Sequence, residues 1–190
     1  MFPNSLIILD RDGVLNHMVV NPEHGIVDSP LHSDQVQVDL KTAQALCDLK
    51  KMGFELAVAT NQPAAAKGKT TFENLKAVHS KVLELLNATD FLQNRSYICW
   101  HKKEDNCECR KPKAGLLLKA LTEAHADPSK SWMIGDGVTD LVAGKLAGVK
   151  TAFIGPRKTD VCKIFQEHNV EPDLWCSDLS DFTKQIANKN

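Results

Sequence analysis

The fold of this chain is decided by the stretch Leu6-Ile7-Ile8-Leu9-Asp10-Arg11-Asp12-Gly13. Four consecutive apolar residues are typical of a strand that is buried on both faces of a parallel sheet. Asp10 would then lie at the carboxyl end of the strand, the edge where open α/β sheets bind ligands. Carboxylates one residue apart repel each other unless a cation or an anionic substrate makes use of them. The stretch therefore predicts a site for a hard metal ion and an anionic substrate.

Length and charge limit what the chain can be. With 190 residues and a formal net charge of -1, we expect residues 1–190 to form a single domain with a sizeable core. The balanced charge gives no reason to expect a nucleic-acid partner. The longest apolar runs are too short to span a membrane, and residues 1–4 lack the pattern of a signal peptide. We therefore expect a cytoplasmic, monomeric protein with a small-molecule substrate and no membrane partner.

Apolar runs alternate with amphipathic stretches along the chain, and each kind predicts one type of element. Strands are predicted at 6–9, 55–60, 97–99, 131–134 and 150–154, and helices at 40–52, 71–86, 114–124, 141–147, 161–168 and from 179 onward. Residues 16–39, which contain Pro22, Gly25 and Pro30, predict a long loop over the carboxyl edge of the sheet. The alternation predicts a doubly wound, Rossmann-like α/β fold with a mostly parallel sheet and helices on both faces.

The spacing of apolar residues predicts which helix faces are buried. In the first predicted helix this face comprises Leu40, Ala43, Leu46, Cys47 and Leu49. In the second it comprises Leu75, Val78, Val82 and Leu86.

Polar residues follow three of the predicted strands. Asp10 and Asp12 follow the first, Thr60 and Asn61 end the second, and Asp136 follows the fourth. Because the carboxyl ends of parallel strands share one edge, we expect these side chains to converge. Carboxylates are the ligands that magnesium prefers, although acids at strand ends also serve as turn residues and helix caps. Convergence from three strands favours the metal site.

A second cluster is formed by Cys99-x-His101 and Cys107-x-Cys109. Three thiolates and one imidazole complete a tetrahedral zinc site without an open position, which indicates a structural ion. The alternative is a group of buried thiols beside a surface histidine. Clustered cysteines of this spacing also indicate metal binding in a reducing compartment rather than disulfides. Because Cys109 leads directly into Arg110 and Lys111, the zinc would fix where these two basic side chains point.

The order Asp10-x-Asp12-Gly13, Thr60-Asn61, Lys111-Pro112 and Gly135-Asp136-x-x-x-Asp140 resembles the four motifs of the haloacid dehalogenase-like phosphohydrolases. The resemblance covers roughly residues 6 to 154. It implies a two-step phosphoryl transfer in which Asp10 is the nucleophile and Asp12 the proton donor and acceptor. It also implies a catalytic Mg²⁺ held by Asp10, the backbone carbonyl of Asp12, and Asp136.

The same resemblance implies roles for further residues. Thr60 and the amide of Asn61 would bind phosphoryl oxygens, and Lys111 would complete the catalytic set with a fixed positive charge. Asp140 would orient Asp136 or the waters of its metal, or else cap the following helix.

The zinc element narrows the resemblance to two kinds of small phosphatase that lack a large cap domain. One acts on D-glycero-D-manno-heptose 1,7-bisphosphate and the other on histidinol phosphate. The loop Glu23-His24-Gly25-Ile26 favours the heptose branch, whereas the five residues between His101 and Cys107 favour the histidinol-phosphate branch. The expected substrate-binding residues are Gly13, Glu23, His24, Gly25, Ile26, Asn61, Gln62, Arg110 and Lys111.

Arg110 is expected to discriminate between these substrates. A guanidinium suits a second phosphate or a pair of sugar hydroxyls, and a bisphosphate offers the former. The alternative is a surface arginine paired with Glu104 or Glu108. A protein of another class, a zinc-stabilised binding protein without activity, is disfavoured because Asp10, Lys111 and the other motif residues are intact.

Overall fold

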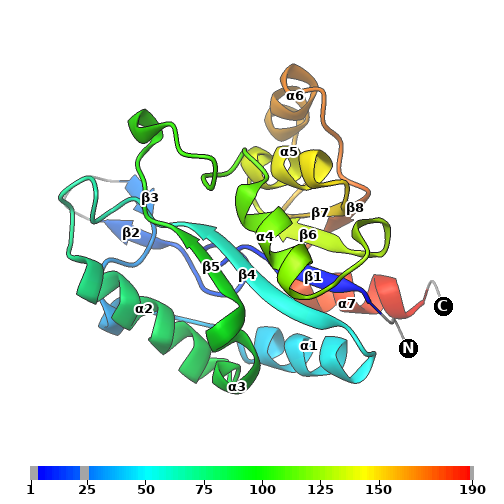
Figure 1. The fold of residues 1–190 in the computed structure, drawn as a ribbon, viewed down its shortest axis with the longest axis horizontal. Coiled ribbons are helices and arrows are strands. Elements are labelled where there is room, and N and C mark those ends of the chain that lie inside the picture. The colour runs from blue at the N-terminus through cyan, green and yellow to red at the C-terminus, as the bar shows by residue number, and fades with distance from the viewer. Residues whose placement is uncertain (1–3, 22–25, 189–190) are drawn as a thin grey trace.

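The computed structural model describes residues 4–21 and 26–188 and contains a six-stranded parallel sheet in the order β5-β4-β1-β6-β7-β8 (Figure 1). The strands of this sheet are β1 (Leu6–Leu9), β4 (Glu55–Asn61), β5 (Ser96–Cys99), β6 (Trp132–Gly135), β7 (Lys150–Ile154) and β8 (Leu174–Cys176). The α-helices are α1 (Leu40–Lys51), α2 (Phe72–Leu85), α3 (Thr89–Leu92), α4 (Gly115–Glu123), α5 (Val138–Ala147), α6 (Thr159–Glu167) and α7 (Leu179–Ala187). Short 3-10 helices lie at η1 (Ser33–Gln35), η2 (Gln93–Arg95), η3 (Lys103–Asp105) and η4 (Pro128–Lys130). The predicted doubly wound α/β fold is confirmed.

The central strand β1 is buried on both faces, as its apolar run predicts. It pairs in parallel with β4 and β6, and its four side chains are fully buried. Ile7 and Leu9 belong to the core under α1, α2, α3 and α7, whereas Leu6 and Ile8 belong to the core under α4 and α5 (Figure 1). This alternation places helices on both sides of the sheet and leaves Asp10 at its carboxyl edge.

The buried face of α1 differs from the predicted one. Leu40 is 87% exposed and Cys47 is exposed, whereas Thr42, Ala45, Leu46 and Leu49 are buried. The observed set has the i, i+3, i+4, i+7 spacing of one helical stripe. Thr42 and Ala45, which are small, therefore face the protein core in place of Leu40 and Cys47. The prediction for α2 is confirmed, because its expected apolar residues are fully buried. Among the described residues, no helix combines the length and apolar composition needed to cross a bilayer.

The segment between β1 and α1 is not the continuous loop that was predicted. It contains β2 (Val19–Asn21) and β3 (Ile26–Asp28), which pair antiparallel, followed by η1. Each strand has only three residues, and Val20 and Val27 are mostly exposed, so neither has the pattern of a buried strand. An ion pair of 2.5 Å between Asp28 and Lys69 connects this hairpin to the segment after β4.

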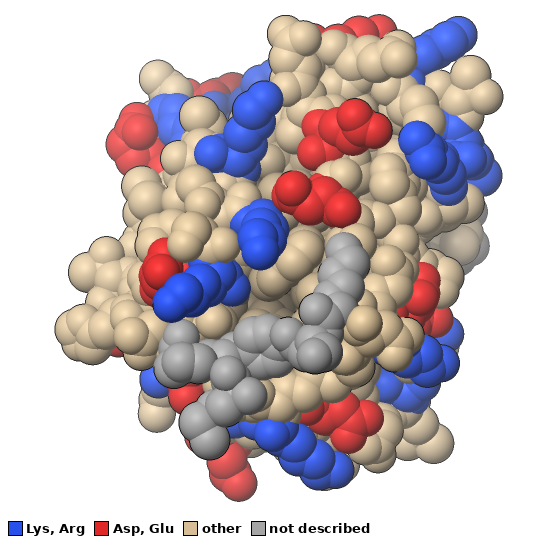
Figure 2. Space-filling view, turned by 90° about the vertical axis from the view of Figure 1, so that its right-hand side faces the viewer, with Lys and Arg blue, Asp and Glu red and all other residues tan. Residues whose placement is uncertain are grey.

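Charges of both signs are mixed on the side of the molecule where the chain ends lie (Figure 2). Near the amino ends of the strands, Glu55 lies 3.6 Å from Lys50 and 3.5 Å from Arg95, and Asp127 lies 3.6 Å from Lys130. Such partly exposed surface pairs contribute little to stability. The visible charges on this face form no extended surface of one sign that would attract a polyanion.

One titratable side chain is buried within the helix α2. His79 is 4% exposed, and within the described residues neither ring nitrogen has a hydrogen-bond partner. Burial, with a smaller contribution from the nearby Arg11 charge, lowers the pKa of His79 to about 4. The folded chain therefore keeps this imidazole neutral at pH values where an unfolded chain would protonate it.

Replacing His79 with leucine is expected to reduce the sensitivity of the fold to acid. Between pH 7 and pH 5 the unfolded chain binds a proton at this residue and the folded chain does not, so the native protein loses about 2 kcal/mol of stability on acidification. The variant should lack this loss. Urea unfolding at both pH values measures it, with the exposed His168→Leu as the control. An unchanged difference between the two pH values would contradict the prediction.

Candidate active site

Acidic and basic side chains converge at the carboxyl edge of the sheet. Asp10, Asp136 and Asp140 each offer a carboxylate oxygen within 4.8 Å of the others. The Nζ atom of Lys111 lies 3.0 Å from Asp10 Oδ1 and 2.5 Å from Asp140 Oδ1. It also donates a hydrogen bond of 2.8 Å to the carbonyl of Ala59. The edge thus holds three carboxylates around one ammonium group.

The electrostatics of this group indicate an excess of negative charge. Burial and the neighbouring Asp140 charge raise the pKa of Asp10 to about 6, although Lys111 opposes the shift. Asp136 keeps an exposed edge, yet the surrounding protein and the charges of Asp10 and Asp140 raise its pKa to about 7. The two carboxylates raise the pKa of Lys111 well above its ordinary value against the effect of burial. A divalent cation with oxygen ligands would fit this arrangement.

Glycine at position 13 allows Asp136 to approach the end of β1. Gly13 has φ +85°, a region that favours glycine, and a Cβ atom here would overlap the carboxylate of Asp136. Gly135 is similar, because a Cβ atom there would overlap the side chain of Asp140. These two motif glycines therefore make room for two of the three carboxylates.

The side chain of Asp12 has different partners from that of Asp10. It accepts hydrogen bonds from Arg11, from Asn16 Nδ2 at 3.0 Å, and from Gln62 Nε2 at 2.7 Å. Burial alone would raise the pKa of this carboxyl, but the Arg11 guanidinium and the two amides lower it. Side chains alternate in direction only along β1, which ends at Leu9. The direction of the Asp12 side chain is therefore set by the turn that follows the strand.

The residues at the end of β4 connect the two halves of the site. Asn61 accepts a hydrogen bond from the backbone N–H of Lys111 at 3.1 Å and donates one to its carbonyl at 3.0 Å. Thr60 is 1% exposed, and its hydroxyl accepts a hydrogen bond from Gln62 Nε2 at 3.0 Å. Gln62 was predicted to bind substrate. Its side chain is 1% exposed and bonded to Thr60, Asp12 and Arg11, which leaves it inside the protein.

The predicted substrate contacts are only partly described. Glu23, His24 and Gly25 lie outside the described residues, and Ile26 is described only as the first backbone residue of β3. Arg110 donates a hydrogen bond of 3.1 Å to the carbonyl of His101. Among the ion pairs of the described residues, Glu108 pairs with Lys113 at 2.8 Å instead of with Arg110.

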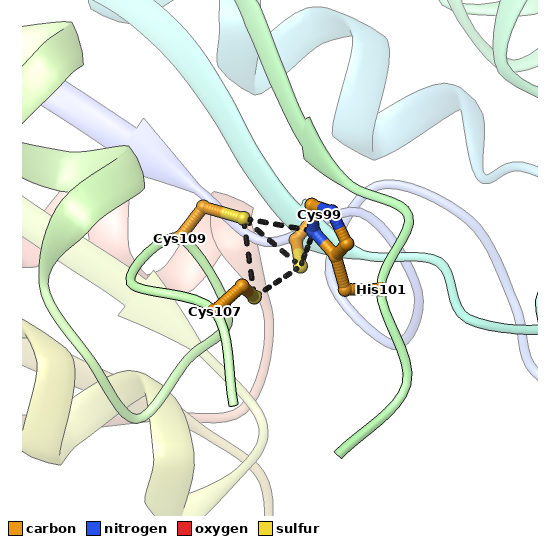
Figure 3. A group of neighbouring side chains, drawn as sticks. All are labelled: Cys99, His101, Cys107 and Cys109. Carbon is orange, nitrogen blue, oxygen red and sulfur yellow. Dashed lines mark hydrogen bonds between the residues drawn. The ribbon is translucent and has the colours of Figure 1, made fainter. Parts of the chain in front are cut away.

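The predicted zinc ligands meet next to this site. The side chains of Cys99, His101, Cys107 and Cys109 point toward one centre (Figure 3). Their sulfur atoms and the Nδ1 of His101 are separated by 3.3 to 3.7 Å in five of the pairs. Zinc–sulfur bonds of about 2.3 Å in a tetrahedron would place ligand atoms roughly 3.7 Å apart. The separations are close to those that a tetrahedral ion requires.

The close approach of the thiols shifts their pKa values in opposite directions. Burial and the neighbouring thiols raise the pKa of Cys109 to about 12. The pKa of Cys107 falls to about 7 because hydrogen bonds from Cys109 and from backbone N–H groups outweigh burial. Three adjacent sulfur atoms cannot all become thiolates unless a cation compensates their charge.

Sequence reasoning missed Arg11 and Asn16, and it left the partner of Asp140 open. Arg11 is fully buried beside Asp12, and Asp140 both accepts a hydrogen bond from the Gly137 N–H at 3.0 Å and pairs with Lys111. A signal for Arg11 was present, since an arginine between two acids at the end of a buried strand is well placed to form a buried ion pair. No comparable signal connects Asp140 with Lys111, because the pairing depends on the fold.

Comparisons with known proteins agree with this geometry. The chain matches the HAD-hydrolase-like family over residues 108–182. It is 32% identical over 186 residues to D-glycero-beta-D-manno-heptose-1,7-bisphosphate 7-phosphatase of Neisseria meningitidis, with 97% of this chain and 96% of that protein covered. It is 36% identical over 135 residues to the histidine biosynthesis bifunctional protein HisB of Legionella pneumophila, with 71% of this chain and 37% of that protein covered.

A solved structure has the same fold over almost its whole length. The D,D-heptose 1.7-bisphosphate phosphatase from B. bronchiseptica, complexed with magnesium and phosphate, superimposes with a TM-score of 0.79 at 26% identity. The superposition covers 98% of this chain and 99% of that one.

Proposed function

This chain belongs to the haloacid dehalogenase-like phosphatases, and from that premise we propose that it removes the 7-phosphate of D-glycero-D-manno-heptose 1,7-bisphosphate. One observation carries the choice of substrate. The similarity to the heptose bisphosphate phosphatase of N. meningitidis extends over 97% of this chain and 96% of that protein, so it is not confined to the shared motifs.

We assign the chemistry of the reaction to Asp10 and Asp12. A carboxylate oxygen of Asp10 attacks phosphorus and forms an aspartyl-phosphate as the bond from phosphorus to the sugar oxygen breaks. The sugar oxygen takes the proton that Asp12 carries in its neutral form and leaves as the alcohol. Water then attacks the aspartyl-phosphate, gives a proton to Asp12, and releases phosphate and free Asp10. Lys111, 3.0 Å from Asp10, supplies positive charge beside the phosphoryl group, whose oxygens would also contact Thr60 and the Asn61 amide.

We propose that Asp10 and Asp136, together with the backbone carbonyl of Asp12, hold a Mg²⁺ ion. The raised pKa values of the two carboxylates support this assignment. They show that the protein alone supplies too little positive charge to balance both ionised carboxylates, and a bound cation would supply the rest. A bound Mg²⁺ would screen the repulsion between the nucleophile and the substrate phosphate. Asp140 is occupied by Lys111 and by the Gly137 N–H, so we assign it the role of positioning Lys111.

We further propose that the cluster of Cys99, His101, Cys107 and Cys109 holds a structural Zn²⁺. Its four protein ligands leave no position for substrate. The cluster is connected to the site at two places: Cys109 precedes Arg110 and Lys111 in sequence, and the Cys99 carbonyl accepts a 2.7 Å hydrogen bond from the Gln62 N–H. Because the thiols are free, we propose a reducing cytoplasm as the location.

Cys107→Ser is expected to lose the zinc ion and, with it, both stability and turnover. We expect about one zinc ion per wild-type chain, and much less zinc and a lower melting temperature in the variant. We also expect kcat to fall by about tenfold or more, because groups that support a metal site usually affect activity by this factor. Metal analysis, thermal unfolding and phosphate release measure the three effects. Cys47→Ser, an exposed cysteine on α1, is the control. Full activity of a zinc-free variant would contradict the role of the ion.

The proposed substrate is tested by comparing heptose 1,7-bisphosphate with histidinol phosphate. With Mg²⁺ present, we expect kcat/KM for the bisphosphate to be at least about tenfold higher than for histidinol phosphate. One additional charged contact with a substrate typically gives a preference of this size. The identity of 36% to the HisB protein and the short zinc loop support histidinol phosphate as the second candidate. A higher kcat/KM on histidinol phosphate would reject the first proposal. Absence of turnover on any sugar phosphate would favour a binding protein.

A further inference from the structure

A buried arginine lies between the two aspartates of the first motif. Arg11 has 0% exposure, and the ion-pair partner that the structure gives it is Asp12. Its Nε donates to Asp12 Oδ1 at 3.1 Å, and its Nη2 donates to Oδ1 at 2.9 Å and to Oδ2 at 3.0 Å. A guanidinium without contact with water requires such a partner, and its planar fork restricts the carboxylate to one orientation.

Gln62 restricts the same carboxylate from a second direction. Its Oε1 accepts a 2.8 Å hydrogen bond from Arg11, and its Nε2 donates to Asp12 Oδ2 at 2.7 Å. The same Nε2 lies 3.0 Å from the hydroxyl of Thr60, the residue assigned to the phosphoryl oxygens. The side chain therefore joins the carboxylate of Asp12 to the end of β4. Both side chains are buried, and the amide of Gln62 and the Nε and Nη2 atoms of Arg11 are engaged within this network rather than directed to a substrate.

We propose that Arg11 and Gln62 are positioning residues that fix the Asp12 carboxylate in the orientation needed for proton transfer to and from the sugar oxygen. This inference rests on the proposed function, which gives Asp12 the proton-transfer role. The two residues act on the reaction only through Asp12. Substitution of either residue should therefore slow the reaction most for substrates whose leaving group needs a proton.

The dependence on the leaving group gives the test. The alkyl alcohol of a sugar phosphate is a poor leaving group and requires a proton, whereas p-nitrophenolate leaves readily without one. In the full-length enzyme with zinc and Mg²⁺ bound, we expect Arg11→Met to lower kcat on the sugar phosphate about a hundredfold, within the usual contribution of acid–base catalysis. On p-nitrophenyl phosphate the loss should be less than about fivefold. General damage to the site would lower both rates equally.

Further variants make the result specific. Asp12→Asn should show the same dependence on the leaving group, and adding Arg11→Met to it should cause little additional loss, since coupled residues are not additive. Arg11→Lys, which keeps the charge but not the fork, should recover only part of the rate. Arg95→Met, which changes a partly exposed arginine near the amino edge of the sheet, is the control and should keep both rates. If Arg11→Met does not fold, Gln62→Leu takes its place, with an expected loss of about tenfold confined to the sugar phosphate.

Failure of the inference can be distinguished from failure of the proposed function. If Asp12→Asn shows no dependence on the leaving group, the proton-transfer role of Asp12 is wrong and the inference falls with it. If Asp12→Asn shows the dependence but folded Arg11 and Gln62 variants lose both rates equally, Asp12 keeps its role. The positioning role of Arg11 and Gln62 is then rejected.

Discussion

The rate of phosphate release by Asp10→Asn is expected to be about 10⁴-fold or more below that of the wild type. Removal of a catalytic nucleophile usually has an effect of this size. The amide has the size of the carboxylate but cannot form an aspartyl-phosphate. The substitution also removes one of the three carboxylates that share the site with Lys111. Because Asp10 has a raised pKa, its ionised form is disfavoured in the folded chain, and the variant should be as stable as the wild type or more so.

Loss of activity without loss of stability identifies Asp10 as a reacting group. Phosphate release at saturating Mg²⁺ and thermal unfolding are measured on the same preparations. Asp48→Asn, which removes a partly exposed acid on α1, should keep both properties and serves as the control. Turnover by Asp10→Asn within about tenfold of the wild type would refute the assignment of the nucleophile, since no other group could replace it at that rate.

The elements that the sequence predicts correctly are those whose signal is local. Residues 6–9 are uniformly apolar and precede an acid, so both the buried strand and the position of Asp10 follow from one short stretch. The convergence of Cys99, His101, Cys107 and Cys109 follows from a local signal for the same reason, because two closely spaced pairs of soft side chains need little knowledge of the fold. These features depend on neighbours in sequence, where periodicity and spacing are informative.

The remaining features depend on contacts between distant residues. The pairing of Lys111 with Asp140 joins the zinc loop to the helix α5, and the bond of Gln62 to Asp12 spans 50 positions. The exposed Leu40 shows the same limit, because apolarity alone does not reveal which side of α1 packs on the protein. The network around Asp12 could not be predicted for a further reason: it lies in the turn beyond β1, where the alternation of a strand no longer applies.

Lys111→Met is expected to damage both the fold and the reaction, for reasons that can be separated. Lys111 is 2% exposed and pairs with Asp140, which is 1% exposed. Its removal leaves a buried carboxylate without its cation, a change that costs about 3 to 5 kcal/mol. Its removal also takes positive charge away from the phosphoryl group. We expect kcat to fall by about 10²-fold or more, the scale of one electrostatic donor.

The double variant Lys111→Met/Asp140→Asn separates these two effects. It removes both partners of the buried pair, so stability in urea should return to within about 1 kcal/mol of the wild type, as often follows when a buried ion pair is replaced together. Activity should not return, because Asp10 and the substrate phosphate still lack the ammonium 3.0 Å from the nucleophile. If turnover recovered together with stability, Lys111 would serve only to neutralise Asp140. The stability of the buried pair and the stabilisation of the transferred phosphoryl group are therefore distinct contributions of one side chain, and the double variant measures each of them.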